Sequence, residues 1–295
     1  MDIFDQKITR RRVLCRCAQA ATFTAVASSL QPLLAAPQSR WFKIGACDWS
    51  LGKGSDLGAF DVAREIGLDG VQVSMGTARN DMQLRKPEMQ KAYLDKAKKT
   101  GVEIGSLALG ELNSVPLKSD LRAAEWLAQS IDVCQALGIT VVMPAFFGSG
   151  GLDMGNTKEI DHVVEILKGI APNAEKKKVT IGLENTLSAA DNMKIVRRVG
   201  SPAVQVYYDT GNSHYAGRDI YQEIRTLGKL ICEVHVKDGR NMLGEGPIDF
   251  GKVRKALDEI GYSGWIVIEA ATPRGVISDY TTDCKFLKGI FPRQV

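Results

Sequence analysis

Short runs of apolar residues alternate with longer amphipathic stretches from residue 42 onward. The runs are rich in Val, Ile and Leu and have few charges, the pattern of strands that are buried on both faces. Four of these runs lie at residues 42–47, 70–74, 102–107 and 139–144, and four more begin at residues 179, 204, 231 and 264. We therefore predict a strand at each run.

Between the runs, apolar positions recur at helical spacing, as at Leu57, Phe60, Ala63 and Ile66. We predict a first helix that begins near residue 55 and three helices at 87–99, 120–137 and 157–176. Three more begin near residues 187, 217 and 249, and the last covers 279–291. Regular alternation of strand and helix predicts a parallel sheet, and eight such units predict closure. The predicted fold class is therefore α/β, a single (β/α)8 TIM barrel over residues 40–295.

Acidic or imidazole residues close the last four apolar runs. Glu184, Asp209, His235 and Glu269 are separated by 25, 26 and 34 residues, the length of one strand-plus-helix unit. Because the parallel strands of a barrel end on the same face, these side chains should converge there. Three carboxylates and one imidazole suit a hard or borderline divalent ion. Four unrelated polar residues at a solvated rim are the alternative, but their repetition on successive strands favours the metal site.

The basic excess of the chain lies in its N-terminal segment. The chain of 295 residues has a formal charge of +4, but residues 1–36 hold five basic and two acidic residues, which leaves 33 against 32 in the rest. A chain with this balance is not expected to bind nucleic acid, which requires a clustered basic face.

The first residues have the pattern of a targeting segment. Residues 9–14, TRRRVL, carry a twin-arginine pattern, and a weakly apolar stretch and Leu34-Ala35-Ala36 follow. We interpret 1–36 as a signal peptide of the twin-arginine type, which predicts export to the periplasm. A disordered basic tail and a membrane anchor are the alternatives. The apolar stretch is short and contains polar residues, so no stable membrane span is expected after processing.

The cysteines that follow this segment show no spacing typical of a zinc site. Free thiols are the prediction, because a folded barrel of this size needs no disulfide. A disulfide among them is the alternative. These residues are Cys47, Cys134, Cys232 and Cys284.

The chain resembles the xylose isomerase-like TIM-barrel superfamily, the sugar isomerase/epimerase group that also contains endonuclease IV (AP endonuclease family 2). The resemblance rests on the glutamate of the fifth predicted strand and on the motifs YYDTGN, HVKD and GEGPIDFGKVRKALDEIGYSGWIVIEA. It implies that Glu184, Asp209, His235 and Glu269 bind one divalent ion, with Mn²⁺ favoured and Mg²⁺, Co²⁺ or Zn²⁺ as alternatives. It also implies that Glu184 and Glu269 are catalytic and exchange protons with opposite faces of the substrate.

Two positions differ from the ketose epimerases of this group. Those enzymes carry a histidine three residues after the strand-6 aspartate, where this chain has Asn212, and a glutamate six residues after the strand-5 glutamate, where it has Ala190. The metal ligands are unaffected by either difference. The substrate-binding residues that we predict, each with a loop or packing role as its alternative, are Arg240, Asn212, Trp49, Lys237 and His214.

These features predict a divalent-metal-dependent sugar isomerase or epimerase that moves a proton next to a carbonyl through an enediolate. The expected partner is a small carbohydrate or polyol without phosphate, since an exported enzyme would rarely meet phosphorylated sugars. A dehydratase or lyase acting on an inosose or 3-keto-glycoside is the second hypothesis. A non-catalytic sugar-binding barrel and a phosphodiesterase of the endonuclease IV type are weaker, because the latter needs more than three histidines. A homo-oligomer stays open.

Overall fold

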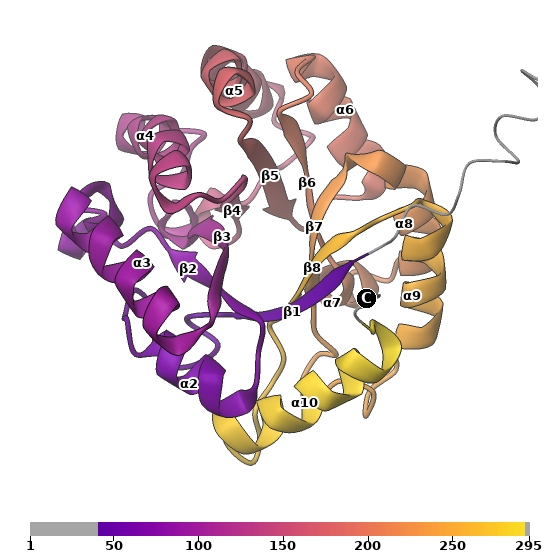
Figure 1. Ribbon diagram of the computed structural model, residues 1–295. Coiled ribbons are helices and arrows are strands. Elements are labelled where there is room, and N and C mark those ends of the chain that lie inside the picture. Colours follow the sequence, from indigo (N-terminus) through magenta and orange to yellow (C-terminus); the bar gives the residue numbers. More distant parts are fainter. Residues whose placement is uncertain (1–40, 293–295) are drawn as a thin grey trace, which may run out of the picture. The chain divides into compact units, whose positions relative to one another are not determined.

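The computed structural model describes residues 41–292. Within this range eight parallel strands, paired in chain order, form a closed barrel with helices around it (Figure 1). The prediction of a (β/α)8 barrel is therefore confirmed, whereas the signal peptide predicted at 1–36 lies outside the described residues. The strands are β1 (Phe42–Cys47), β2 (Gly70–Ser74), β3 (Glu103–Leu109), β4 (Val141–Phe146), β5 (Thr180–Asn185), β6 (Val204–Asp209), β7 (Ile231–Val236) and β8 (Gly264–Ile268).

Helices connect the strands and cover the outside of the barrel (Figure 1). Several end at a glycine in the left-handed conformation, such as Gly67 after α2 and Gly138 after α4. The α-helices are α2 (Ala59–Ile66), α3 (Pro87–Thr100), α4 (Leu121–Leu137), α5 (Thr157–Lys177), α6 (Ala189–Val199), α7 (Thr210–Tyr215), α8 (Ile220–Leu227), α9 (Phe250–Glu259) and α10 (Val276–Ile290). The short 3-10 helices are η1 (Ala78–Asn80), η2 (Gln83–Arg85), η3 (Gly110–Asn113), η4 (Gly148–Gly150) and η5 (Gly228–Leu230).

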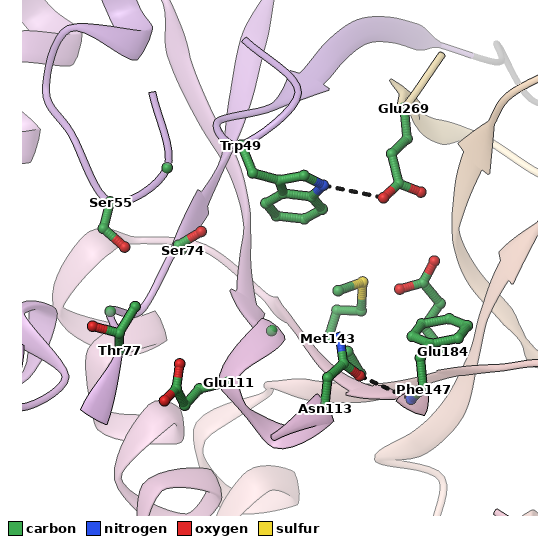
Figure 2. Close-up of a pocket in the computed structure, with 14 residues that line it drawn as sticks. Trp49, Ser55, Ser74, Thr77, Glu111, Asn113, Met143, Phe147, Glu184 and Glu269 are labelled. Atoms are coloured by element: carbon green, nitrogen blue, oxygen red, sulfur yellow. Dashed lines mark hydrogen bonds between the residues drawn. The ribbon is translucent and has the colours of Figure 1, made fainter. Parts of the chain in front are cut away.

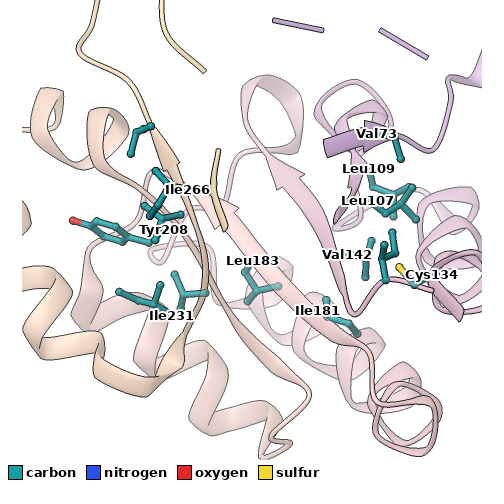
Figure 3. Packing of buried hydrophobic residues seen from close by; sticks show 14 of the residues in the cluster. Val73, Leu107, Leu109, Cys134, Val142, Ile181, Leu183, Tyr208, Ile231 and Ile266 are labelled. Atoms are coloured by element: carbon teal, nitrogen blue, oxygen red, sulfur yellow. The ribbon is translucent and has the colours of Figure 1, made fainter. Parts of the chain in front are cut away.

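The main hydrophobic core lies between the strands and the surrounding helices. Figure 3 shows Leu107 and Leu109 of β3 beside Val142 of β4, with Cys134 of α4 packed nearby. Burying one such aliphatic side chain contributes about 1.5–3 kcal/mol to folding. Alternate residues of each strand point the other way, into the barrel, so the strand pattern fixes which side chains reach the interior.

The inside of the barrel is apolar at one end and polar towards the other. Trp265 fills the end where the strands begin, and glycines of three strands make room for its ring. An added Cβ at Gly70 would lie 2.4 Å from the indole, and Gly45 and Gly105 also face it. Further along the strands, polar residues such as Gln72, Ser106, Glu233 and His235 are buried in the interior beside a small cluster that includes Met143 and Tyr207.

Some predicted element boundaries are wrong for local reasons. Ser55 does not begin a helix, because it adopts a left-handed φ of 57° and its N–H donates to Asp48 Oδ2 at 3.0 Å. The fourth strand begins two residues later than predicted, because the N–H of Ile139 caps α4 by donating to the Cys134 carbonyl at 3.0 Å. Two helices, α7 and α8, replace the one predicted between the sixth and seventh strands.

The cysteines of the described chain are free thiols, as predicted. They lie on β1, α4, β7 and α10, and all except the half-buried Cys232 are fully buried. Burial raises the pKa of the Cys47 thiol to about 12, so this group stays protonated at neutral pH. No helix of the described residues combines the length and apolar character that a membrane crossing needs.

Candidate metal centre and adjoining cavity

The four predicted metal ligands converge at the ends of β5 to β8. Each offers one ligand atom, and these atoms all lie within 4.8 Å of one another. Glu184, Asp209 and His235 belong to the strands themselves, whereas Glu269 follows β8 and is held by its N–H donating to the Val236 carbonyl at 3.0 Å. The alternation of inward and outward side chains along each strand therefore brings these residues together.

His235 lies at the centre of this cluster and is fully buried. Its Nδ1 is 2.8 Å from Glu184 Oε1, 3.6 Å from Glu269 Oε2 and 4.0 Å from Asp209 Oδ2. The other ring nitrogen, Nε2, lies 2.8 Å from Gln72 Oε1. Nδ1 is therefore the nitrogen that faces the three carboxylates.

The two oxygens of Asp209 have different surroundings. Oδ1 accepts the N–H of Asn212 at 2.8 Å and so caps α7. Oδ2 is buried and accepts no hydrogen bond from the described residues, although the ammonium of Lys237 lies 2.9 Å away. Burial raises the pKa of the Asp209 carboxyl to about 7, and the nearby charges of Glu184 and Glu269 add to this effect, whereas Lys237 opposes it.

Lys237 joins the cluster as a charge partner. Its Nζ lies 2.6 Å from Glu269 Oε2 as well as 2.9 Å from Asp209 Oδ2. Burial alone would lower the pKa of this lysine, but the two carboxylates outweigh burial and raise it. The predicted contact of Lys237 with a substrate stays a prediction.

Glu269 is held as a carboxylate. The indole Nε1–H of Trp49 donates to its Oε1 at 3.1 Å, and Lys237 contacts its Oε2. Burial favours the protonated acid, but the charges of His235 and Lys237 outweigh burial and lower the pKa of Glu269. A carboxylate kept ionised in a largely buried site can bind a cation or accept a proton.

The residues fit a divalent metal ion. Three carboxylates crowded around one imidazole repel one another, and the single charge of Lys237, which contacts Asp209 Oδ2 and Glu269 Oε2, offsets only part of their negative charge. A divalent cation would balance the remaining charge. Three oxygen donors and one nitrogen donor suit Mn²⁺, Mg²⁺, Co²⁺ or Zn²⁺ and do not by themselves choose among these ions.

A cavity of about 330 Å³ adjoins this cluster and opens at the barrel mouth. Figure 2 shows Glu184 and Glu269 on one side of the cavity and Ser55, Ser74, Thr77 and Glu111 on the other. The other lining residues include four with apolar side chains, Trp49, Met143, Ala145 and Phe147. Hydroxyl and carboxyl groups beside an aromatic wall suit a polyhydroxy ligand of sugar size.

The predicted substrate-binding residues are only partly brought to this cavity. Trp49 lines it, and Lys237 lies in the adjacent cluster. Asn212 and His214 lie on α7, where His214 is half-buried with its ring edge-on to Tyr215 at 5.0 Å. Arg240 is exposed on the segment after β7. None of these last three is among the residues that line the cavity, and their substrate contacts stay predictions.

The sequence patterns missed the residues of the opposite cavity wall and one residue beneath the cluster. Glu111 and Asn113 lie in η3 directly after β3, so the strand-end rule that found the metal ligands could also have found them. Asn113 Oδ1 accepts the Phe147 N–H at 2.8 Å and joins the turns after β3 and β4. Gln72 is the polar residue inside the otherwise apolar run GVQV, which is a further signal in the sequence.

The protein is a (β/α)8 barrel with a metal-type cluster of three acids and one imidazole at the ends of its strands. Residues 60–290 match the family described as the xylose isomerase-like TIM barrel, so the chain belongs to that family.

Named relatives and solved structures agree with this membership. The 2-epi-5-epi-valiolone 7-phosphate 2-epimerase of an Actinoplanes species is 27% identical over 223 residues, which cover 73% of this chain and 80% of that protein. The D-psicose 3-epimerase of Clostridium cellulolyticum with D-tagatose is 18% identical with a TM-score of 0.72, over 84% of this chain and 99% of that one. The 3-keto-D-glucoside 4-epimerase of E. coli is 16% identical with a TM-score of 0.69, over the same shares.

Proposed function

We propose that this protein is a divalent-metal-dependent isomerase or epimerase that acts on a sugar or polyol without phosphate. The observation that carries this proposal is the double position of Glu184 and Glu269, which belong to the metal-type cluster and also line the cavity. A sugar in the cavity would therefore meet two carboxylates and the metal site at one end. The names of the relatives support epimerisation, but two of these relatives are named for phosphorylated substrates, so the absence of phosphate rests on the cavity lining and on the proposed export.

The side chains of the cluster would hold the metal ion, and two of them would also transfer protons. Glu184, Asp209, His235 and Glu269 would hold the ion, proposed as Mn²⁺, which when bound supplies Lewis-acid polarisation of the substrate carbonyl. Glu269, whose lowered pKa keeps it ionised, can take a proton from the carbon next to that carbonyl. Glu184 offers the second carboxyl group, which would return a proton to the substrate.

The cavity lining supports a substrate without phosphate. Three carboxylates, Glu111, Glu184 and Glu269, face the cavity, and no lysine or arginine is among the described residues that line it. A phosphate dianion would be repelled there, whereas hydroxyl groups can donate to the carboxylates. Trp49 and Phe147 add apolar surface for the C–H face of a sugar ring.

Elimination on an inosose or a 3-keto-glycoside is the second candidate function. It begins with the same proton abstraction, and it does not need the glutamate that ketose epimerases carry where this chain has Ala190. Ala190 is exposed in the first turn of α6 and does not line the cavity. The ammonium of Lys237 beside Glu269 would provide a second cationic group near a leaving oxygen.

Export by the twin-arginine route is a further part of the proposal and rests on residues 9–14 of the sequence. Changing Arg10 and Arg11 to Lys should leave an unprocessed precursor in the cytoplasm. Normal processing of that double variant would rule out this route.

Carbon-bound deuterium exchange tests the proposed chemistry. The purified protein, loaded with Mn²⁺, is incubated in D₂O with keto-sugars, inososes and 3-keto-glycosides, and the carbon-bound protons are followed by NMR. An isomerase or epimerase should exchange one proton and interconvert sugars, whereas a lyase should release a leaving group. No exchange with any of these, together with no gain in melting temperature on adding Mn²⁺, would favour a non-catalytic sugar-binding barrel.

A further inference from the structure

Gln72 lies beneath the metal-type cluster in the barrel interior and is 1% exposed. Its Oε1 is 2.8 Å from His235 Nε2 and also accepts the Cys47 thiol at 3.4 Å. We propose that Gln72 is a positioning residue that fixes the tautomer of His235 and thereby sets the affinity of the centre for its metal ion. Its role rests on the proposed metal centre.

The tautomer matters because only one ring nitrogen faces the acids. Nδ1 lies within 4.0 Å of carboxylate oxygens from three strands, so a metal ion must be bound through the lone pair of Nδ1. The proton of a neutral imidazole must then reside on Nε2, deep in the barrel. Gln72 Oε1 is the acceptor that satisfies this proton, the arrangement that orients metal-ligating histidines generally.

The amide of Gln72 is itself held by further hydrogen bonds. Its Nε2 donates to Ser106 Oγ at 3.1 Å and to Tyr207 Oη at 3.0 Å. If the amide were reversed, its NH₂ group would face His235 Nε2 and favour the tautomer with the proton on Nδ1. That tautomer would present an N–H, and no lone pair, to the metal site.

The ring of His235 is held by packing as well. Tyr207 lies against it at 4.5 Å between centroids and 62° between planes, and Trp49 approaches edge-on at 6.1 Å. These rings limit rotation of the imidazole but cannot choose which nitrogen is protonated. Each ring nitrogen has further polar neighbours, because Glu184 Oε1 lies 2.8 Å from Nδ1 and Cys47 Sγ lies 3.4 Å from Nε2. Once the lone pair of Nδ1 binds a metal ion, Gln72 Oε1 at 2.8 Å is the nearest acceptor for the proton on Nε2.

Two substitutions at this position separate a tautomer effect from a packing effect. Gln72→Met keeps the length and much of the volume but removes the strong acceptor, and Gln72→Glu keeps an acceptor oxygen. We expect Gln72→Met to weaken Mn²⁺ binding by roughly 10- to 100-fold, the usual effect of losing such a partner. Gln72→Glu should bind Mn²⁺ at least as tightly as the unmodified protein. Gln205→Met is the control, because Gln205 bonds only the exposed Pro202 carbonyl in the described chain.

Titration calorimetry with Mn²⁺ measures the affinity, and ¹⁵N NMR of the histidine rings reports the tautomer. The chain has three histidines, so comparison with His235→Ala assigns the signal. The proposal expects a proton on Nε2 of His235 in the protein loaded with diamagnetic Mg²⁺ or Zn²⁺, and loss of this preference in Gln72→Met.

A folded Gln72→Met that binds Mn²⁺ as tightly as the unmodified protein would overturn the proposal, as would a proton on Nδ1 of His235 in the loaded protein. If the unmodified protein takes up no ion, the metal centre fails and the role of Gln72 falls with it, whereas equal uptake by the unmodified protein and Gln72→Met overturns the role of Gln72 alone.

Discussion

The two sides of the barrel mouth are built from different kinds of structure. The strand ends of β5 to β8 supply the metal-type cluster, whereas the turns after β1 to β4 supply the opposite wall of the cavity. On the first side, rigid hydrogen-bonded strands place buried acids within 4.8 Å of one another. On the second, 3-10 turns and loops place hydroxyl and acidic side chains at half-exposed positions (Figure 2).

This difference separates chemistry from recognition. Acids crowded around one imidazole can hold a cation and transfer protons. Half-exposed groups such as Ser55, Thr77 and Glu111 can exchange hydrogen bonds with the hydroxyl groups of a ligand. Substitutions on the cluster side should therefore change metal binding and kcat, and substitutions on the opposite wall should change KM.

The largest effect is expected at the two glutamates that belong to both the cluster and the cavity. Glu184→Gln and Glu269→Gln keep an oxygen for the metal but remove a proton-accepting group. If these residues transfer protons, kcat should fall by roughly 10²–10⁴ and stay low at saturating Mn²⁺. Steady-state rates measured over a Mn²⁺ titration check this result.

The same pair distinguishes isomerase from lyase. In an isomerase or epimerase a proton leaves and returns, so both variants should be crippled. In a lyase the base that takes the proton is indispensable, and the acid that assists a good leaving group matters less. Full recovery of both variants with added Mn²⁺ would mean that the glutamates are metal ligands only.

The second largest effect is expected on metal affinity, at a cluster residue that is not proposed to transfer protons. His235→Ala removes the nitrogen ligand and leaves three acids without their central partner, so Mn²⁺ affinity should fall tenfold or more. Metal analysis after dialysis and calorimetry measure the loss. His162→Ala is the matched control, because His162 is exposed on α5. Equal metal content in both variants would show that the ligand set is wrong.

The two sides also differ in how far the sequence predicts them. Glu184, Asp209, His235 and Glu269 could be found because each closes an apolar run, and the geometry of a parallel barrel then brings strand ends together. The opposite wall is different, because Glu111 and Asn113 follow a strand but the shape of the turns that hold the other residues depends on long-range contacts. Asp48, for example, joins the turn after β1 to the end of β2 by accepting the Ser55 and Ser74 N–H groups at 3.0 and 2.7 Å.

The interior support of the cluster lies between these extremes. Gln72 is visible in the sequence as a polar residue in a buried strand, but its partner on β7 is 163 residues away. Only the closed barrel shows that the oxygen of its amide meets His235. The fold and the ligand set therefore follow from periodicity and spacing, whereas cavity shape and hydrogen-bond partners require the three-dimensional structure.

The smallest effect is expected on the opposite wall, at Glu111. Its carboxylate faces the cavity across from Glu184 and Glu269 (Figure 2), so a hydroxyl at the non-reacting end of the sugar can donate to it. Glu111→Gln keeps the shape and one acceptor but removes the charge. Because one hydrogen bond contributes about 0.5–1.5 kcal/mol, KM should rise roughly two- to tenfold while kcat changes little. Kinetics with the sugar identified by deuterium exchange give both constants.

Glu125→Gln, at an exposed position of α4, is the matched control and should leave both kcat and KM unchanged. A fall in kcat at unchanged KM for Glu111→Gln would place this residue with the catalytic groups and remove the distinction between the two sides of the mouth.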